Sequence, residues 1–241
     1  MFKSRNRANQ LKTLFDILLP PRCVLCGLAS DSTCICPPCK FDLPWLERQC
    51  RSCGLPLVLA TDLICGACIT KPPPYNYTVC PLSYEFPTDR LVQAFKFRKQ
   101  HTAGRLLARF LAEAAFNSQS DRPDVLVPVP LHRFRLIKRG FNQAYELATY
   151  IGKQLGIEVQ MESLRRKRYT RAQSGLSRKQ RNKNVRGAFY WKSLQRPASH
   201  VALVDDVMTT GTTVMECARV LKRAGTKRVD VWVAARAVPV S

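Results

Sequence analysis

Apolar runs alternate with amphipathic stretches through the second half of this chain. Short, largely apolar runs at residues 124–130 and 201–204 are typical of strands buried on both faces of a sheet. Apolar residues recur at helical spacing over 142–155 and again from Thr213 onward. Strands that alternate with helices in this order predict a parallel sheet with right-handed crossovers. We therefore expect an α/β domain over residues 75–241.

Weaker patterns predict the remaining elements of this domain. The alternation of residues 77–86 indicates a strand, and residues 87–117 indicate two helices. Residues 131–140 are basic and have no clear period, so we expect a loop there. Shorter strands are expected at 157–161, 188–191 and 230–233. The last two would come before and after the 201–204 strand along the chain.

The N-terminal region has a different character from the α/β domain. One apolar stripe at helical spacing precedes Pro20-Pro21, and its members are Leu11, Leu14, Phe15, Leu18 and Leu19. We expect a short amphipathic helix within residues 1–20 that packs on the next module, with a membrane-surface anchor as the alternative. The proline-rich run Lys71-Pro72-Pro73-Pro74 predicts a stiff linker, and we place the domain boundary there.

Between these two regions the chain carries four C-x-x-C pairs. Each pair points two thiolates at one place, and two pairs close a tetrahedral Zn²⁺ site. The pattern predicts a double zinc-ribbon module over residues 21–70 with two structural zinc ions, and its spacing favours zinc over an Fe–S cluster. Consecutive pairing and a crossed pairing, in which the first pair joins the third, both remain open. The predicted ligands are Cys23, Cys26, Cys36, Cys39, Cys50, Cys53, Cys65 and Cys68.

Charge adds a class of partner to this picture. The 241 residues carry 39 Lys+Arg against 17 Asp+Glu, a formal net charge of +22. Such a surface attracts polyanions, above all nucleic acid. Cysteines in metal-type pairs indicate a reducing compartment and not a disulfide-stapled secreted domain. No apolar stretch is long enough to cross a membrane, and the N-terminus lacks the features of a signal peptide, so we expect a cytoplasmic protein.

Residues 165–186 are strongly basic, with ten Lys or Arg and no acid. The segment lacks apolar periodicity, so we expect a surface loop. Its positive charges repel one another, and a bound polyanion would relieve that repulsion. Phe134, Phe141 and Tyr169 are rings that can stack on bases. The alternative for Phe134 and Phe141 is a place in the core, which is what we expect for Phe141. The candidate nucleic-acid contacts are Arg165, Arg166, Lys167, Arg168, Tyr169, Arg171, Arg178, Lys179, Arg181 and Lys183.

The sequence from Val201 to Thr213 carries the most specific chemistry. An apolar strand leads to Asp205-Asp206, which we expect at the strand end, and then to a hydroxyl-rich turn around Gly211 that enters a helix. A helix N-terminus suits a phosphate, and adjacent carboxylates suit the hydroxyls of a ribose or a Mg²⁺ that bridges them. Together these features indicate a phosphoribosyl group. The residues expected to bind it are Asp205, Asp206, Thr209, Thr210, Gly211, Thr212 and Thr213.

This stretch resembles the phosphoribosyl pyrophosphate (PRPP) signature of type I phosphoribosyltransferases. Other parts of the chain extend the resemblance, namely the cysteine pairs, Val127-Pro128-Val129-Pro130, Lys138-Arg139-Gly140-Phe141-Asn142-Gln143-Ala144 and the basic segment. In this order they resemble the ComF/GntX family, whose members join a zinc-ribbon region to a phosphoribosyltransferase-like domain. The resemblance covers roughly residues 20–236, nearly the whole chain.

The resemblance implies a type I phosphoribosyltransferase-like parallel-sheet domain preceded by a small zinc-ribbon module with four-cysteine sites. It implies that Asp205 and Asp206 bind the ribose of PRPP, that residues 209–213 bind its 5′-phosphate, and that Mg²⁺ accompanies it. Lys138 and Arg139 would face the pyrophosphate. A part in bacterial DNA uptake is also implied, with single-stranded DNA as partner, other uptake proteins such as a helicase or channel as further candidates, and the inner face of the membrane as a candidate location.

Three functions remain open from the sequence. The first is a DNA-handling protein of natural transformation that binds single-stranded DNA and a PRPP-type ligand, which charge and resemblance favour. The second is a PRPP-dependent phosphoribosyltransferase whose acceptor is unknown, because no base-recognition residues stand out. The third is a regulator that binds PRPP and DNA without turnover. A fold does not fix a function, so we rank DNA handling first and phosphoribosyl transfer second.

Overall fold

The computed structural model describes residues 21–57, 63–167, 185–192 and 196–238. The chain divides into two compact units, residues 1–43 and residues 44–241. The amphipathic helix expected within residues 1–20 lies outside the described part, and so do residues 168–184 of the basic segment. The loop predicted to bind the phosphate, residues 209–213 (the ligand loop), and its flanking elements are described without a gap.

The small unit is built around four cysteines. Cys23 and Cys36 are buried, as are Ile35 and Leu43. α2 (Pro37–Phe41) begins directly after Cys36, and proline suits a first helical position because the N–H there needs no partner within the helix. With so few buried apolar side chains among its described residues, this unit has little core, and a bound metal would supply its folding free energy.

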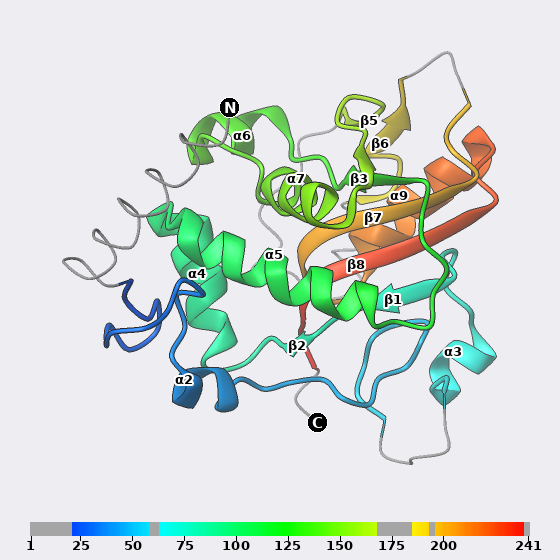
Figure 1. Cartoon of the computed structure of the whole chain (residues 1–241). Coiled ribbons are helices and arrows are strands. Elements are labelled where there is room, and N and C mark those ends of the chain that lie inside the picture. The colour runs from blue at the N-terminus through cyan, green and yellow to red at the C-terminus, as the bar shows by residue number, and fades with distance from the viewer. Residues whose placement is uncertain (1–20, 58–62, 168–184, 193–195, 239–241) are drawn as a thin grey trace, which may run out of the picture. The chain divides into compact units, whose positions relative to one another are not determined.

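A parallel sheet forms the centre of the large unit, as the alternation of strands and helices predicts (Figure 1). Its strands are β1 (Tyr77–Val79), β2 (Leu82–Ser83), β3 (Val125–Pro128), β4 (Glu158–Val159), β7 (His200–Met208) and β8 (Arg228–Arg236). They lie in the order β1-β8-β7-β3-β4, with β2 also paired to β8, and all of these pairings are parallel. β7 and β8 are central and largely buried, because helices cover both faces of the sheet.

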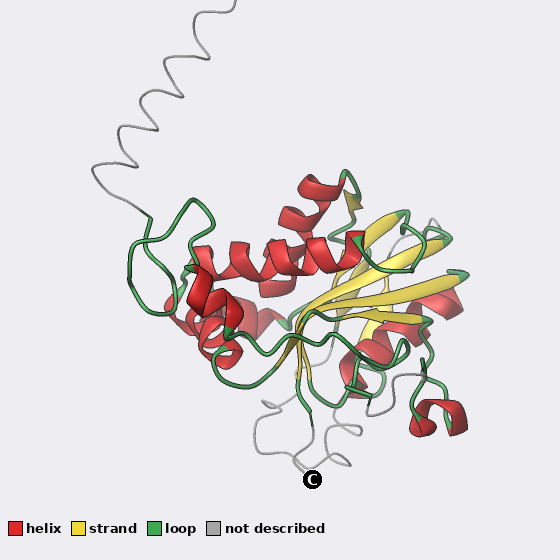
Figure 2. Cartoon of the chain, turned by 60° about the horizontal axis from the view of Figure 1, so that its bottom comes forward, coloured by secondary structure: helices red, strands yellow, loops and turns green. Residues whose placement is uncertain are grey.

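Four helices build these two covering layers. They are α4 (Thr88–Arg98), α5 (His101–Phe116), α7 (Gln143–Leu155) and α9 (Thr212–Ala224). α5 and α7 contact each other and pack on one face, with α4 beside α5, whereas α9 packs on the other face (Figure 2). The helices predicted over 87–117 and 142–155 are confirmed. The apolar positions that predicted α7, among them Leu147 and Ile151, are buried against the sheet.

A loop was the wrong prediction for residues 131–140, because they contain a short helix, α6 (Arg133–Arg139). His132 caps this helix, since its Nδ1 accepts a hydrogen bond from the N–H of Phe134 at 3.2 Å. Phe134 is 63% exposed and Ile137 is 70% exposed. The helix therefore has no buried apolar stripe of the kind that a periodicity argument detects.

The predicted end of one strand was also wrong, and another predicted strand pairs outside the parallel sheet. β7 does not end before the acid pair but continues to Met208, with Asp205 opposite Val233 of β8. The strand expected at 188–191 is present as β6 (Phe189–Trp191), yet it pairs antiparallel with β5 (Leu164–Arg166), outside the parallel sheet. Arg165 and Arg166 thus lie on a strand and not in a loop. Strands this short carry too few residues for their partner to be read from the sequence.

The second set of cysteine pairs belongs to the large unit. The N–H of Thr78 in β1 donates to the carbonyl of Arg51 at 2.7 Å, and the N–H of Leu46 donates to the carbonyl of Pro81 at 2.8 Å. α3 (Gly66–Thr70) carries the last cysteine of the set. The described residues of the second set, 44–57 and 63–70, thus belong to the same unit as the sheet, although the sequence suggested a boundary at the proline run. The division into modules ending at residues 20 and 70 stays a prediction.

Candidate metal centres and ligand site

The eight paired cysteines gather into two clusters of four, Cys23, Cys26, Cys36 and Cys39 (the first cluster) and Cys50, Cys53, Cys65 and Cys68 (the second cluster). Within each cluster the four Sγ atoms lie within 4.8 Å of one another. The Sγ atoms of Cys26 and Cys36 are 3.7 Å apart, as are those of Cys53 and Cys65. Thiolates bound about 2.3 Å from one tetrahedral Zn²⁺ lie about 3.8 Å apart, so both clusters fit zinc.

The clusters decide how the C-x-x-C pairs combine. The first pair joins the second and the third joins the fourth, so the consecutive arrangement is correct and the crossed one is not. Burial raises the pKa of Cys39 and of Cys68 well above 9.0, and the neighbouring thiols raise it further. Four thiolates therefore need a cation between them. Four soft ligands that close the coordination sphere are typical of a structural zinc and not of a catalytic one.

The connection from β7 to α9 has the backbone of an anion site. Gly211 has a φ of +72°, a left-handed conformation in which a side chain is strained. α9 begins at Thr212, directly after this glycine, so the positive end of a 13-residue helix faces the loop. The hydroxyls of Thr210 and Thr212 share a hydrogen bond of 2.8 Å. The predicted phosphate ligands thus lie together around one helix N-terminus.

The acid pair lies just before this loop. Asp206 is 7% exposed, and its Oδ2 lies 2.8 Å from Nζ of Lys96 in α4. Burial, and after it the Asp206 carboxylate, raises the pKa of Asp205 from 3.8 to about 7. The carboxylate of Asp205 accepts a hydrogen bond from the N–H of Asp206 at 2.8 Å, which lowers the pKa of Asp205, but burial raises this pKa by more. A ligand that brings hydroxyls or a cation would stabilise the charge at Asp205.

Two cations that sequence reasoning did not assign to the site contact it. Lys96 pairs with Asp206, and nothing in the sequence sets this lysine apart from other basic residues at the end of α4. Arg236, the last residue of β8, is 5% exposed and donates from Nη1 to the carbonyl of Met208 at 2.9 Å and to that of Thr209. The signal for Arg236 was a charged residue directly after the apolar run of residues 231–235.

The cations predicted to face pyrophosphate are only partly placed. Nη1 of Arg139 donates to Oε1 of Gln143 at 3.0 Å, and the guanidinium lies 5.6 Å from the centre of the Phe97 ring. The side chain of Lys138 lies outside the described part of the structure. A pyrophosphate role for Lys138 and Arg139 therefore stays a prediction.

Three of the predicted nucleic-acid contacts are described. Arg165 pairs with Glu162 at 3.1 Å, the Arg166 guanidinium lies 5.2 Å from the centre of the Phe189 ring, and Lys167 follows β5. The other candidates lie outside the described residues, namely Arg168, Tyr169, Arg171, Arg178, Lys179, Arg181 and Lys183. The nucleic-acid role of the basic segment thus stays a prediction.

The two phenylalanines considered as stacking rings have different surroundings. Phe141 packs against Phe95 and His101, with ring centres 5.5 Å apart in each case, but it is half-buried and does not belong to the buried core in which we expected it. Phe134 lies against His132, with ring centres 5.5 Å apart, and is 63% exposed. Of these two rings, Phe134 is the one that presents a large surface to solvent, where a base could reach it.

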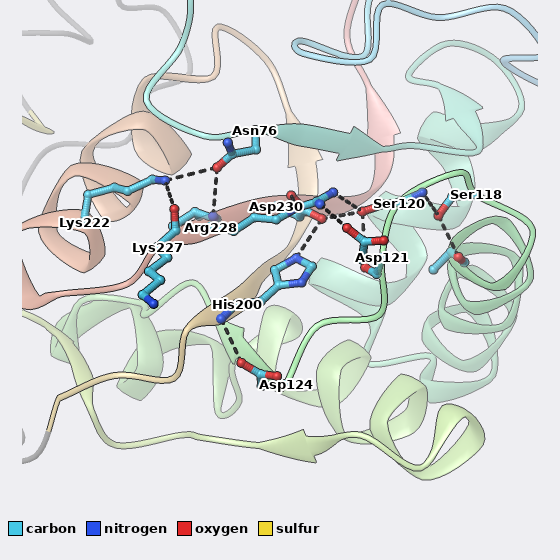
Figure 3. Close-up of polar contacts among 12 residues, drawn as sticks. Asn76, Ser118, Ser120, Asp121, Asp124, His200, Lys222, Lys227, Arg228 and Asp230 are labelled. Carbon is cyan, nitrogen blue, oxygen red and sulfur yellow. Dashed lines mark hydrogen bonds and ion pairs between the residues drawn. The ribbon is translucent and has the colours of Figure 1, made fainter.

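A separate polar network lies toward the amino ends of β7 and β8 (Figure 3). Asp230 is 0% exposed, accepts hydrogen bonds from Ser120 Oγ at 2.5 Å and Arg228 Nε at 3.2 Å, and lies 2.9 Å from Nε2 of His200. Burial by itself would raise the pKa of Asp230, but these hydrogen bonds, led by His200, lower it below 3.8. Protein groups satisfy this carboxylate, so the network stabilises the fold.

Comparison with known proteins agrees with both parts of the site. Residues 14–82 match the double zinc ribbon domain family, and residues 98–238 match the phosphoribosyl transferase domain family. The chain is similar to competence protein F of Haemophilus influenzae, at 34% identity over 90% of this chain and 97% of that protein. It is also similar to the DNA utilization protein YhgH of Salmonella typhimurium, at 35% identity over the same shares of the two chains.

Solved structures add a more distant similarity. The glutamine phosphoribosylpyrophosphate amidotransferase of B. subtilis, complexed with ADP and GMP, superposes with a TM-score of 0.38 at 24% identity, over 56% of this chain and 26% of that one. This overlap is too slight to support an argument. The family matches are sufficient, because they confirm the predicted fold class, a phosphoribosyltransferase domain with a parallel sheet preceded by a double zinc ribbon.

Proposed function

The chain belongs to the family of competence protein F and the DNA utilization protein YhgH, and we propose that it acts in DNA uptake by binding a PRPP-type ligand and single-stranded DNA. The names of the relatives, which refer to competence and to DNA utilization, support a role in DNA uptake. The match to the phosphoribosyl transferase domain supports a phosphoribosyl compound as the ligand. The observation that carries the proposal is the acid pair near the carboxyl end of β7, separated only by Val207 and Met208 from a glycine loop that opens a helix.

The ligand would lie across the carboxyl end of β7. Its 5′-phosphate would accept hydrogen bonds from N–H groups at the start of α9, and its ribose hydroxyls would donate hydrogen bonds to Asp205 and Asp206. Only Val207 and Met208 separate the acids from the loop, so one small ligand can contact both. Lys96 adds positive charge beside the acids, as binding of a pyrophosphate requires. Mg²⁺ would neutralise the pyrophosphate when bound, and carboxylate oxygens are ligands that it prefers.

Thermal unfolding with PRPP and Mg²⁺ tests this site. Ligand at about 100 times its Kd should stabilise the protein by about 2.7 kcal/mol, or roughly 5–11 °C in Tm. Asp205→Ala combined with Asp206→Ala, or Gly211→Val alone, should abolish this shift. Glu158→Ala, at an exposed position on β4, should keep it. Equal stabilisation of the double variant and the wild type would mean that PRPP does not bind here.

DNA binding is supported by positive charge beside exposed rings. Phe97 is 70% exposed with the Arg139 guanidinium beside its ring, and Phe134 is exposed on α6, which contains no acid. Rings that face solvent among cations suit stacking on bases while phosphates are neutralised. The basic segment, residues 165–186, and the net charge of +22 add to this attraction.

Salt dependence of single-stranded DNA binding tests the second half of the proposal. Binding should depend little on sequence, and changing Arg165, Arg166, Lys167 and Arg168 to Ala should flatten the slope of log K against log salt by up to ~3 units. Phe134→Ala or Tyr169→Ala should weaken binding by about 1–3 kcal/mol with little change in slope. Phe116→Ala, which removes an 80% exposed ring from α5, should leave binding unchanged.

A different outcome of the same experiment would favour another function. If the four-alanine variant loses PRPP affinity but keeps DNA binding with an unchanged salt slope, the basic segment serves PRPP. Phosphoribosyl transfer to an unknown acceptor would then be the better proposal, and the acid pair with its loop already supports it as second candidate. Release of pyrophosphate from PRPP, measured with nucleobases and with single-stranded DNA, distinguishes transfer from binding without turnover.

We also propose a cytoplasmic location at the inner face of the membrane, where an imported single strand emerges, with an uptake helicase or channel as partner. Among the described residues, no helix has both the length and the apolar character needed to cross a membrane. Cell fractionation, followed by cross-linking during DNA uptake, tests this location. Recovery of the protein away from the membrane throughout uptake, with no uptake protein attached, would contradict it.

A further inference from the structure

Arg236 connects the second cysteine cluster to the ligand loop. Its Nε donates to the carbonyl of Cys53 at 2.8 Å, and its Nη1 donates to the carbonyls of Met208, at 2.9 Å, and of Thr209. Nη1 also donates to the carbonyl of Ala237 at 2.7 Å. One buried, planar side chain thus holds the backbone of a cluster ligand and the start of the loop.

These hydrogen bonds fix the direction in which the loop presents its amides. In a trans peptide the C=O of one residue and the N–H of the next lie in one plane and point in opposite directions. Arg236 binds the carbonyls of Met208 and Thr209, so the N–H groups of Thr209 and Thr210 point away from it. They are therefore directed away from the core-side guanidinium, as N–H groups that bind an anion must be.

The backbone of the second cluster is in turn fixed by close packing. Gly54, which follows Cys53, has a φ of +67°, and a Cβ there would meet Cγ2 of Thr78 at 2.9 Å and Cδ of Arg236 at 3.7 Å. Oγ1 of Thr78 donates to the carbonyl of Ser52 at 2.6 Å. The turn that carries Cys50 and Cys53 therefore sits against β1 and against Arg236 with no room for a side chain.

A second contact joins the same regions. Tyr75, directly after the proline run, is 6% exposed, and its hydroxyl lies 4.0 Å from Sδ of Met208. A Cβ on Gly211 would meet this hydroxyl at 3.5 Å. The loop is thus supported from behind by the side chains of Arg236 and Tyr75, both of which lie in the same compact unit as the second cluster.

We propose that zinc in the second cluster sets the geometry of the ligand loop through Arg236, so that ligand affinity depends on metal at this cluster and not at the first. The inference rests on the proposed ligand site and adds a regulator to it. Arg236 is a positioning residue, because it contacts the loop and not the ligand. Coupling between two sites is reciprocal, so the ligand must also strengthen retention of zinc at the second cluster.

Zinc release from the full-length protein tests the reciprocal effect. The protein is mixed with a chromogenic chelator in the presence and absence of PRPP with Mg²⁺, and Cys26→Ser and Cys53→Ser identify the release phase of each cluster. Ligand should slow release from the second cluster about fivefold or more and leave the first unchanged. Arg236→Lys keeps the charge but lacks the Nε–H that binds Cys53, so the slowing should disappear in this variant.

Hydrogen exchange of the loop tests the coupling without any ligand. At a temperature where circular dichroism shows folded protein, Cys65→Ser should speed exchange of amides 208–214 about fivefold or more, whereas Cys39→Ser should not. Arg236→Lys should act like Cys65→Ser. Arg122→Ala is the matched control, because Arg122 also donates to two carbonyls, those of Leu155 and Gly156, at 2.7 Å each.

The two measurements distinguish this inference from the proposed function. If loop exchange responds only to the second cluster but PRPP slows no zinc release, the coupling holds and the proposed ligand is wrong. If PRPP stabilises the protein while both clusters affect the loop equally, or neither affects it, the coupling through Arg236 is wrong. Slowing of zinc release that persists in Arg236→Lys would likewise overturn it.

Discussion

Asp205 and Asp230 lie on adjacent strands of one sheet, and their carboxyl groups have opposite pKa shifts. Burial, with Asp206 next to it, raises the pKa of Asp205 to about 7. At Asp230 burial acts in the same direction, but hydrogen bonds from His200, Ser120 and Arg228 outweigh it and lower the pKa. Burial alone therefore does not decide the direction of the pKa shift. The supply of hydrogen-bond donors from within the protein decides it.

The difference follows the direction of the strands. Near the carboxyl end of β7 burial outweighs the contacts that favour the charged form of Asp205, and open α/β sheets bind their ligands at this end of the strands. Toward the amino ends the fold surrounds Asp230 with donors. We therefore expect variants at Asp205 to gain stability and lose ligand binding, and variants at Asp230 to change stability alone.

Removal of Asp230 should have the largest effect on stability. Asp230→Ala leaves Arg228 and His200 without their buried partner, which should lower the free energy of unfolding by about 3–5 kcal/mol and Tm by roughly 6–20 °C. Asp121→Ala is the control, because this carboxylate pairs with the same Arg228 but is 82% exposed, and its loss should cost less than ~1 kcal/mol. Urea unfolding measures the free energy of unfolding of both variants. If Asp121→Ala destabilises the protein as much as Asp230→Ala, the buried network does not have the proposed importance for stability.

Asp205→Asn should raise the free energy of unfolding, whereas Asp230→Ala should lower it. The amide removes a poorly solvated charge, so the ligand-free protein at about pH 8 should gain on the order of 2 kcal/mol, or roughly 4–8 °C in Tm. Stabilisation by PRPP and Mg²⁺ should disappear in the same variant. Glu158→Gln, at an exposed site, should change neither quantity. A less stable Asp205→Asn protein would show that the carboxylate contributes to the fold.

The pH dependence of stability should separate the two carboxyl groups. The pKa of Asp205 is raised on folding, so its contribution is full below about 3.8 and is lost as pH rises through about 7. The pKa of Asp230 is lowered, so its contribution is present above 3.8 and is lost as pH falls through its folded pKa. The advantage of Asp205→Asn over wild type should therefore grow from about pH 4 to about pH 7 and change little at higher pH, and the deficit of Asp230→Asn should shrink below about pH 4.

Urea titrations at each pH measure both differences. The slope that one such group contributes cannot exceed about 1.4 kcal/mol per pH unit, which sets the precision required. Differences that stay constant with pH would contradict the assigned shifts.

Replacement of Lys96 should have the smallest effect on stability. Lys96→Met removes the partner of Asp206 and should cost about 1 kcal/mol. Because the charge of Lys96 lowers the pKa of Asp205, the variant should move the pH transition of Asp205 upward. Lys153→Met, at an exposed position on α7, is the control and should leave the transition in place. An unchanged transition in Lys96→Met would mean that this lysine does not affect the acid pair.

The sequence by itself determined those features that depend on residues close together in the chain. Helical spacing predicted α5 and α7, apolar runs predicted β3 and β7, and the C-x-x-C pairs predicted metal ligands. The structure also contains the strand, glycine loop and helix in the predicted order, and the ligand site inferred from them stays a prediction. α6 was missed because its apolar residues face solvent, and a periodicity argument detects only buried stripes.

Tertiary structure alone decided which distant residues meet. In the strand order β1-β8-β7, β8 lies between β7, which carries the acid pair, and β1, which follows the second cluster. This order brings Arg236 to Cys53 across 183 positions of sequence. The same packing pairs Lys96 with Asp206 and encloses Asp230 with Ser120 and His200. Local patterns cannot encode these contacts, because a side chain finds such partners only after the sheet fixes which strand ends lie together.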